Sequence, residues 1–472
     1  MLSFNHQDLS TWTGGQWTQS PVECATGFAI DSRKIQPGDL FIALRAQRNG
    51  HEFLNQAVQG GAFGSLVDHV VEGVNCPQLV VKNTLTAFQQ IAKFYRNQFD
   101  GTVVGVTGSC GKTSTKEILK LLLNQVHATK GNLNNHLGVP LTLCEMNPDI
   151  HACAVIEAGI NKTGEMKDLA ELIQPNICVI TSIENSHLDG LGNLETIAEE
   201  KIKLWSESKD SCLAVFPEEI LKFEAFTNAL KAMKPHILVT KVDRKETQPV
   251  NENQVTYHLS TETNERGYSQ VISINRCGYP PLVTSIPHVS SGMVSNMILS
   301  CVVAWKIGIS DQEICERLPQ YRPSGLRGSR LVGRGCSYVL DCYNANPSSM
   351  VDAVQYFYQK YQGDRKLLVL AGMNELGESS DYLHRETGSL INLADADRAI
   401  LIGGYAEHMA KGMMDSGAKE EQISVLKEAE DARPIVEEFR GVVLLKGSRS
   451  FSLESLVPAW AVEETEAMSV AC

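Results

Sequence analysis

A strand, a glycine-rich turn and a helix follow one another without interruption, and this run constrains the fold more than any other. The strand is predicted at Thr102–Val106 and the helix from about Lys112, where one apolar stripe comprises Ile118, Leu119, Leu122, Leu123 and Val126. The turn between them comprises Thr107, Gly108, Ser109, Cys110, Gly111, Lys112 and Thr113. Glycines let the backbone approach an anion, and N–H groups at a helix N-terminus supply positive potential. The run therefore predicts a phosphate-binding loop at the edge of a parallel sheet.

The side chains at the end of this loop suit a nucleotide. Lys112 is placed to meet the β- and γ-phosphates, and the Thr113 hydroxyl can ligate Mg²⁺. The residue five positions before Gly111 is Val106 rather than glycine, so the loop has the shorter G-x-x-G-K-T form. The alternative is a glycine-rich turn that carries a lysine by chance, and the strand–loop–helix context argues against it.

Two further predicted strands end on polar residues. Ala152–Ile156 leads to Glu157, and Ile177–Thr181 leads through a short segment to His187. Because ligands bind outside the carboxyl ends of strands in open α/β sheets, we expect both side chains near the loop. Mg²⁺ prefers oxygen ligands, which suits Glu157 better than His187. Taken singly, either residue could instead be a helix cap or a satisfied polar group.

The length and strand pattern indicate an α/β protein of three domains. A chain of 472 residues is too long for one ordinary core. Residues 1–98 read as a small α/β domain, residues 99–315 as the phosphate-loop domain with a mostly parallel sheet, and residues 316–472 as a Rossmann-like α/β domain. The last begins with a Pro-, Gly- and Arg-rich stretch at 318–327, expected to be a linker. Its predicted strands are Tyr338–Leu340, Leu367–Leu370, Ala399–Ile402 and Val442–Leu445.

Composition excludes several classes of function. A formal net charge of −13 argues against non-specific nucleic-acid binding. No apolar run approaches the roughly 20 residues that span a bilayer, and the first residues do not resemble a signal peptide. Thirteen cysteines without a C-x-x-C pair argue against a disulfide framework or a structural zinc site. We expect a cytoplasmic monomer that binds neither nucleic acid nor membrane.

Further runs resemble one known family, the Mur ligases. In the central domain they are the phosphate loop, Glu157 with residues 161–165, and residues 187–190. Five further runs are similar to the branch of the family that adds D-alanyl-D-alanine. They lie at 131–135, 138–142, 341–347, 372–377 and 446–450. Runs at 31–33, 37–41 and 50–53 resemble that family's UDP-sugar domain. The resemblance covers nearly the whole chain.

The resemblance implies a ligase that uses ATP and Mg²⁺, with two ions expected. Such an enzyme would join D-alanyl-D-alanine to UDP-N-acetylmuramoyl-tripeptide through an acyl phosphate, in peptidoglycan precursor synthesis, and the C-terminal domain would close on ATP and bind the incoming dipeptide. The alternatives are a diamino-acid-adding or folate-type ligase of the same architecture, or a homologue that binds ATP without catalysis.

The resemblance also assigns roles to individual residues. Thr107–Thr113 would bind ATP phosphate, and the catalytic residues would be Lys112, Glu157, His187 and Lys201. The metal ions would be bound by Thr113, Glu157, His187 and a carbamylated Lys201. Without the resemblance, Lys201 would be read as a solvated charge on a helix.

Contacts to the nucleotides and the dipeptide follow in the same way. The resemblance places Asn296 at adenine, Arg327 between the domains, and Asp341, Tyr343 and Asn344 at ribose and phosphate. It places Ser32 and Arg33 near uridine diphosphate, Asn135 near the nucleotide-sugar peptide, and Lys446 and Arg449 at the incoming dipeptide.

Three positions depart from the family's usual pattern. The run Ser290–Met293 lacks a histidine and an asparagine, Gly372 stands where aspartate is usual, and Cys110 where asparagine is common. A helix N-terminus and the Lys112 charge are conditions that lower a cysteine pKa, so we expect Cys110 to react early. The alternative is a thiol that points into the sheet as an inert hydrophobe.

Overall fold

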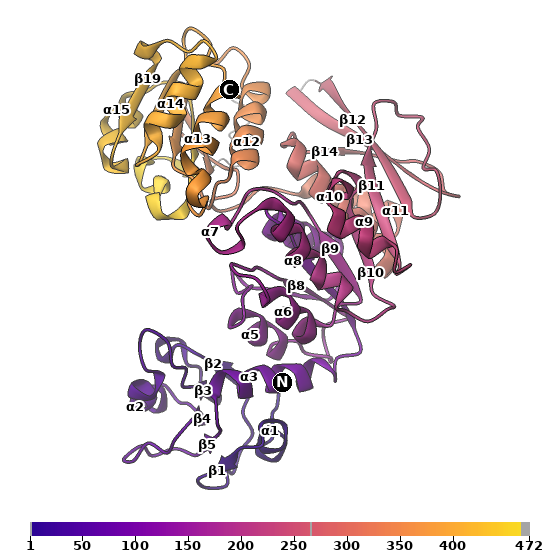
Figure 1. Cartoon of the computed structure of the whole chain (residues 1–472), viewed down its shortest axis with the longest axis vertical. Helices are drawn as coiled ribbons and strands as arrows, with labels where there is room; N and C mark the ends of the chain where they lie inside the picture. The colour runs from indigo at the N-terminus through magenta and orange to yellow at the C-terminus, as the bar shows by residue number, and fades with distance from the viewer. Residues whose placement is uncertain (1, 265–266, 464–472) are drawn as a thin grey trace.

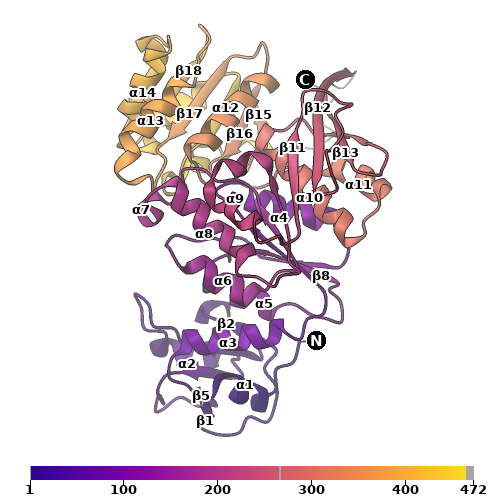
Figure 2. The same cartoon turned by 45° about the vertical axis from the view of Figure 1, so that its right-hand side comes forward.

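The computed structural model describes residues 2–264 and 267–463. Three sheets follow one another along the chain, each with its own helices, and they form three lobes (Figures 1 and 2). The predicted three-domain α/β architecture is confirmed. No helix in these described ranges has the length and apolar character needed to cross a bilayer.

The N-terminal lobe contains a five-stranded sheet in the order β1-β5-β4-β3-β2. β1 is antiparallel to β5 and the other pairs are parallel. The strands are β1 (Gln16–Trp17), β2 (Gly27–Ala29), β3 (Asp39–Ile42), β4 (Gly64–Val67) and β5 (Gln78–Val80). The α-helices are α1 (His6–Thr13), α2 (Leu54–Gln59) and α3 (Thr84–Arg96).

The central lobe contains a nine-stranded sheet in the order β14-β13-β12-β11-β10-β9-β6-β8-β7. The strands are β6 (Thr102–Thr107), β7 (Val126–Ala128), β8 (Cys153–Glu157), β9 (Ile177–Ile180), β10 (Leu213–Pro217), β11 (His236–Lys241), β12 (Gln254–Asn264), β13 (Gly267–Arg276) and β14 (Leu282–Ile286). The seven from β7 to β12 are parallel, while β13 and β14 extend the sheet in antiparallel fashion. Because β6 lies between β8 and β9, the ends of these three strands meet at one edge.

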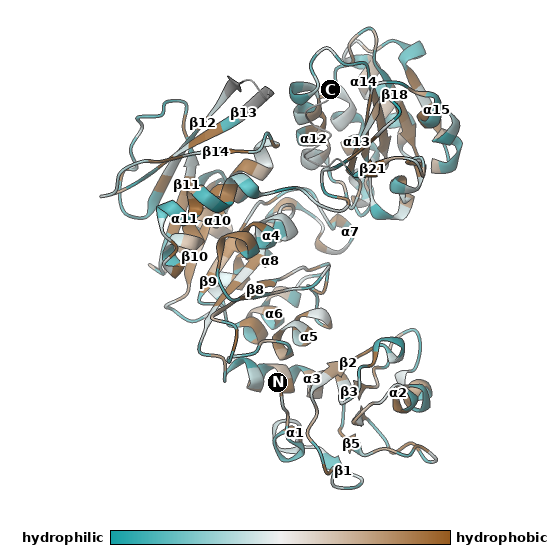
Figure 3. Ribbon diagram, turned by 180° about the vertical axis from the view of Figure 1, so that it is seen from behind, coloured by the Kyte–Doolittle hydropathy of each residue, from teal (hydrophilic) through white to brown (hydrophobic). Residues whose placement is uncertain are grey.

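Helices cover both faces of the central sheet. They are α4 (Lys112–Leu122), α5 (Gly138–Cys144), α6 (Glu165–Ile173), α7 (Leu188–Leu191), α8 (Leu194–Ser206), α9 (Glu224–Leu230), α10 (Ser291–Ile307) and α11 (Asp311–Arg317). The apolar faces of α4 and α10 pack together in one core, as the brown side of these helices in Figure 3 shows. The predicted stripe on α4 is correct as far as Leu122, but Val126 lies in β7 because the chain turns at Leu123–Gln125.

The C-terminal lobe contains a seven-stranded sheet in the order β19-β18-β17-β20-β16-β15-β21, in which β15 is antiparallel to both of its neighbours and the other pairs are parallel. Its strands are β15 (Ser329–Gly333), β16 (Cys336–Asp341), β17 (Lys366–Ala371), β18 (Arg398–Ile402), β19 (Ile423–Leu426), β20 (Val442–Lys446) and β21 (Val462–Glu463). Its α-helices are α12 (Pro347–Lys360), α13 (Ser380–Ser389), α14 (Ala406–Asp415) and α15 (Arg433–Glu438). Residues 321–328, between the second and third lobes, belong to no helix or strand.

Candidate active site

The loop between β6 and α4, residues 107–113, has the geometry of a phosphate-binding loop. Gly108 and Gly111 have φ of 148° and 84°, in the region that favours glycine. A Cβ at Gly108 would lie 1.9 Å from Oγ1 of Thr181, so that position also lacks space for a side chain. Helix α4 begins at Lys112, which directs its first N–H groups toward the loop.

Thr113 and Glu157 meet at the edge formed by β6 and β8. The Thr113 hydroxyl donates to Oε2 of Glu157 at 3.2 Å, and the Asn134 amide donates to the same oxygen at 3.3 Å. Glu157 is fully buried at the end of β8. Two of the four residues expected at the metal ions are therefore in direct contact.

Lys116 also contacts Glu157, although it was not among the predicted site residues. Its ammonium lies 3.3 Å from Oε1 of Glu157 and donates to the Thr129 carbonyl at 2.8 Å. Lys116 is 1% exposed. The available signal was its position one helical turn after Lys112, which points both side chains toward the same end of α4.

The donor set suits a hard divalent cation. Oε1 of Glu157 is buried and has no hydrogen-bond partner among the described residues, although Lys116 neutralises its charge. A carboxylate beside a threonine hydroxyl offers the oxygen ligands that Mg²⁺ prefers. These residues therefore fit the ion that the loop predicts.

Two lysine amines converge on one carbonyl of the loop. Lys112 Nζ donates to the Gly108 carbonyl at 2.6 Å, and Lys201 Nζ, from α8, donates to the same oxygen at 3.3 Å. Burial, together with the charge of Lys112, lowers the pKa of Lys201 well below its ordinary value. Burial also lowers the pKa of Lys112. Lys201 is thus a buried loop contact and not a solvated helix charge, and an anion in the loop would compensate both amines.

His187 lies apart from this cluster in its contacts. The residue has φ of 54° and precedes α7, and its Nδ1 contacts the carboxylate of Glu375. The Glu375 backbone carbonyl accepts from the Leu188 N–H at 2.7 Å. No hydrogen bond or ion pair joins His187 to Glu157 among the described residues. The structure therefore connects His187 to the C-terminal lobe, and Glu375 was not among the predicted site residues.

Cys110 does not have the environment that the sequence predicted. Burial raises the pKa of the Cys110 thiol, and this outweighs the opposing effect of the Lys112 charge. The Asn346 amide lies 3.1 Å from the sulfur. The expectation of a lowered pKa was wrong because the burial of the thiol depends on the folded chain and not on its neighbours in the sequence.

Asp341 and Lys446 form one pair at the ends of neighbouring strands. They are register partners on β16 and β20, and Lys446 Nζ lies 2.8 Å from Oδ2 of Asp341. The same ammonium donates to the Asn344 carbonyl at 3.2 Å and is buried. Arg449 pairs with Glu454 at 2.7 Å. Both cations expected at the dipeptide therefore have carboxylate partners in this conformation.

A cavity of about 290 Å³ adjoins the loop. Its lining comes from α4, the Gly131–Asn132 turn, the interlobe segment and Tyr343, and includes Thr113, Lys116 and Arg327. The Arg327 guanidinium lies 4.0 Å from the centre of the Tyr343 ring. Arg327 and Tyr343 thus both line the cavity beside the loop.

Asn296 lies on the loop side of α10. The residue is 7% exposed, and a Cβ at Gly111 would lie 2.5 Å from its Oδ1. Ser290, in the run that departs from the family pattern, caps α10 by accepting from the Met293 N–H at 3.4 Å. Although the run Ser290–Met293 departs from the family pattern, α10 still has an N-cap and Asn296 still lies against the loop.

The residues expected at the UDP-linked substrate lie elsewhere. Ser32 donates to Gln56 at 2.8 Å and Arg33 pairs with Asp31 at 2.8 Å, both on the N-terminal lobe. Asn135 accepts from the Gly138 N–H at 3.0 Å at the start of α5. Among the described residues, no hydrogen bond joins Asn135 to Ser32 or Arg33.

Comparisons with known proteins cover all three lobes. Residues 106–304 match the family model described as the Mur ligase middle domain, and residues 328–449 match the one described as the Mur ligase, glutamate ligase domain. The chain is 32% identical over 458 residues to the UDP-N-acetylmuramoyl-tripeptide--D-alanyl-D-alanine ligase of Bacillus subtilis, covering 95% of each protein. It superposes on MurF from Acinetobacter baumannii with a TM-score of 0.83 and 26% identity, covering 96% of this chain and 98% of that one. MurF ligase from Thermotoga maritima in complex with ADP shares the fold, with a TM-score of 0.74, 24% identity and coverage of 91% and 96%.

Proposed function

This chain belongs to the Mur ligase family, and we propose that it uses ATP to join D-alanyl-D-alanine to UDP-N-acetylmuramoyl-tripeptide in peptidoglycan precursor synthesis. The relative from Bacillus subtilis carries that activity in its name and aligns over nearly the whole of both chains. We also propose that the enzyme is cytoplasmic and monomeric.

One observation carries the catalytic part of the proposal. Lys112 and Lys201 both donate to the Gly108 carbonyl of the loop, and Thr113, at the end of the loop, donates to the carboxylate of Glu157. A triphosphate in the loop would therefore meet both cations and oxygen ligands for a metal ion. This is the arrangement that phosphoryl transfer requires, because that reaction depends mainly on positioning and charge stabilisation.

The proposed reaction follows from the chemistry of carboxylates. A carboxylate does not condense with an amine in water because its oxygen is a poor leaving group. Transfer of the γ-phosphoryl group to the terminal carboxylate of the tripeptide gives an acyl phosphate, which the amine of the dipeptide attacks with release of phosphate. Lys112 would bind the phosphoryl oxygens throughout, where negative charge accumulates.

Thr113 and Glu157 would hold one Mg²⁺, and His187 and a carbamylated Lys201 would serve a second. Bound Mg²⁺ neutralises phosphate charge. The lowered pKa of Lys201 supports carbamylation, because the neutral amine is the form that reacts with carbon dioxide. For His187 to reach such a position it would have to exchange its contact with Glu375.

Each lobe has a proposed role. Residues 1–98 would bind the UDP-sugar end of the substrate, with Ser32 and Arg33 near the diphosphate and Asn135 near the peptide. Residues 99–315 would bind ATP phosphate. Residues 316–472 would close on the nucleotide. The cavity at Arg327 and Tyr343 would bind the nucleoside, with Asn296 and Asp341 nearby. After a rearrangement, Lys446 and Arg449 would face the dipeptide.

The deciding experiment supplies purified protein with ATP, Mg²⁺, UDP-N-acetylmuramoyl-tripeptide and one amine at a time, and identifies the product by mass. We expect a product with D-alanyl-D-alanine and none with L-alanyl-L-alanine. Equal turnover with a diamino acid or glutamate would assign the chain to another branch of the family. ATP binding without amine-dependent phosphate release would show a non-catalytic homologue.

A further inference from the structure

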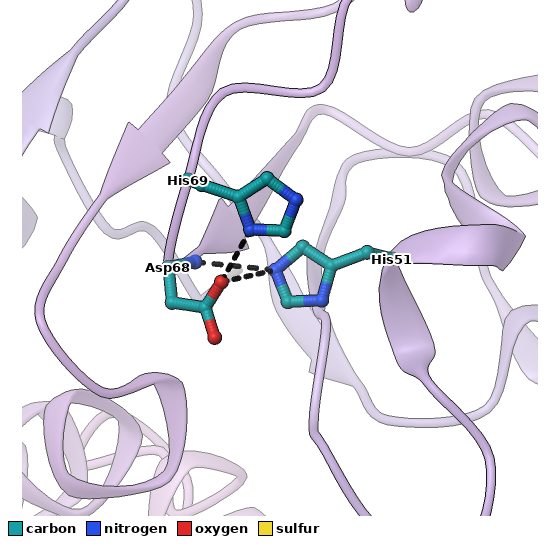
Figure 4. A group of neighbouring side chains, drawn as sticks. All are labelled: His51, Asp68 and His69. Carbon is teal, nitrogen blue, oxygen red and sulfur yellow. Dashed lines mark hydrogen bonds and ion pairs between the residues drawn. The ribbon is translucent and has the colours of Figure 1, made fainter.

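We infer that His51, Asp68 and His69 form a binding site for a divalent transition-metal ion of the zinc class, on the N-terminal lobe and separate from the proposed magnesium site. His51 lies in the 3₁₀ turn Gly50–Phe53, and Asp68 and His69 directly follow β4 (Figure 4). Among the described residues, this is the one group of three or more His, Cys, Asp or Glu side chains whose ligand atoms lie close enough to share an ion.

The distances suit a small ion with little rearrangement. Oδ1 of Asp68 lies 3.2 Å from Nε2 of His51 and contacts Nδ1 of His69 at 2.5 Å, and the three ligand atoms lie within 4.8 Å of one another. Metal–ligand bonds of 2.0–2.1 Å in tetrahedral geometry place ligand atoms roughly 3.3 Å apart. Binding would open the contact between Asp68 and His69, which the exposed His69 can do. It would also displace the Asp68 N–H from Nε2 of His51.

The orientation of His51 supports a ligand role. Its ring is buried, and Nδ1 lies 2.9 Å from Oδ1 of Asn49, an atom that can only accept. Nδ1 therefore carries the proton, and the lone pair of Nε2 accepts from the Asp68 backbone N–H at 3.2 Å, a hydrogen bond that a bound ion would replace. A hydrogen bond that fixes the tautomer of a ligating histidine is the usual second layer of a metal site.

Arg45 competes for the same carboxylate. Its Nε lies 2.5 Å from Oδ2 of Asp68, and its second nitrogen lies 2.9 Å from Oδ1. The nitrogen on Oδ1 also lies 3.4 Å from Nδ1 of His69, so a bound ion would have to displace it, and the largely exposed Arg45 side chain has room to move away. Two imidazoles and a carboxylate select zinc-class ions over Mg²⁺.

The test is titration of metal-free, nucleotide-free full-length protein with Zn²⁺ by calorimetry, and with Co²⁺ by absorption. We expect one Co²⁺ with a spectrum lacking the charge-transfer band of cysteine ligation. His69→Ala should lose this binding, while His408→Ala, which removes an exposed histidine 3.6 Å from Asp381, should retain it. Circular dichroism without metal would establish that His69→Ala folds normally.

Two variants of neighbouring residues sharpen the test. Arg45→Gln should bind Co²⁺ several-fold more tightly, because a competing cation is removed. Asn49→Ala should bind roughly 10- to 100-fold more weakly. Equal binding by the wild type and His69→Ala, a cysteine charge-transfer band, or no gain in Arg45→Gln would overturn the assignment. These readouts are independent of ligase activity.

Discussion

The side-chain amide of Asn346 donates to the sulfur of Cys110 at 3.1 Å, which joins the C-terminal lobe to the phosphate loop. The Ser348 hydroxyl donates to Glu184 at 2.5 Å on the same boundary. Both contacts come from the start of α12. Access to the phosphate loop therefore depends on how the C-terminal lobe is docked.

We expect Cys110 to react slowly with alkylating reagents, because burial raises its thiol pKa. Cys24 and Cys277 are exposed and should be labelled first. Asn346→Ala removes the contact from the C-terminal lobe and should accelerate labelling of Cys110, with Cys24 as the internal standard. Peptide mapping by mass measures all three rates. Modification of Cys110 before Cys24 in the unaltered protein would contradict the raised pKa of its thiol.

Replacing Lys112 with methionine should lower turnover by about 10²–10³, the typical effect of removing one donor that stabilises transition-state charge. Lys120→Met is the matched control, because Lys120 lies on the same helix but pairs only with the partly exposed Glu117 among the described residues. Phosphate release with both substrates present is the measurement. Near-normal turnover of Lys112→Met would refute the proposed role.

Lys116→Met should destabilise the protein by about 3–5 kcal/mol, because the buried carboxylate of Glu157 would lose its cation. Thermal unfolding with and without Mg²⁺ and nucleotide measures the effect. Since a bound cation would replace the lost charge, the ligands should raise the melting temperature of Lys116→Met more than that of the wild type. Equal shifts in the two proteins would show that the ion binds away from Glu157.

Lys201→Ala should be inactive and should regain activity with short carboxylic acids, which can occupy the position of a carbamate. Lys203→Ala, a change two residues away on α8, controls for the helix, since Lys203 is partly exposed and pairs with Glu200. The acids should not rescue Lys112→Met. Full activity of Lys201→Ala without added acid would rule out carbamylation as a requirement.

The buried His384 should make stability depend on pH. Its Nε2 accepts from the Met373 N–H at 2.9 Å, and burial lowers its pKa below the ordinary 6.5. The unfolded chain gains a proton near pH 6.5 while the folded protein does not, so this contribution is complete above that pH and declines as the pH falls. The slope for one group is at most about 1.4 kcal/mol per pH unit.

The measurement is the melting temperature between about pH 7.5 and 5.5. His384→Gln keeps an acceptor for Met373 without a titrating ring, so its melting temperature should fall less steeply than that of the wild type. The exposed His408→Gln should follow the wild type. Parallel curves for His384→Gln and the wild type would indicate that other histidines cause the dependence.

The sequence was most informative where local rules apply. The strand, glycine turn and helix at Thr102–Leu122 are set by short-range sterics and periodicity, and the structure has them within one residue at each end that was predicted. The neighbouring strands β8 and β9, which lead to Glu157 and His187, were located for the same reason. The antiparallel extension by β13 and β14 was not predicted, because strand pairing depends on partners distant in sequence.

Sequence by itself determined which chemistry the loop can support, because glycine, lysine and threonine have fixed conformational and bonding capacities. Tertiary structure decided the environment of each group. Lys201 and Cys110 were both read from their sequence neighbours, yet burial against other elements changes the pKa of each. The contact of His187 with Glu375 likewise arises from lobe docking. Desolvation and charge pairing depend on every atom within a few ångströms, and only the folded chain specifies those neighbours.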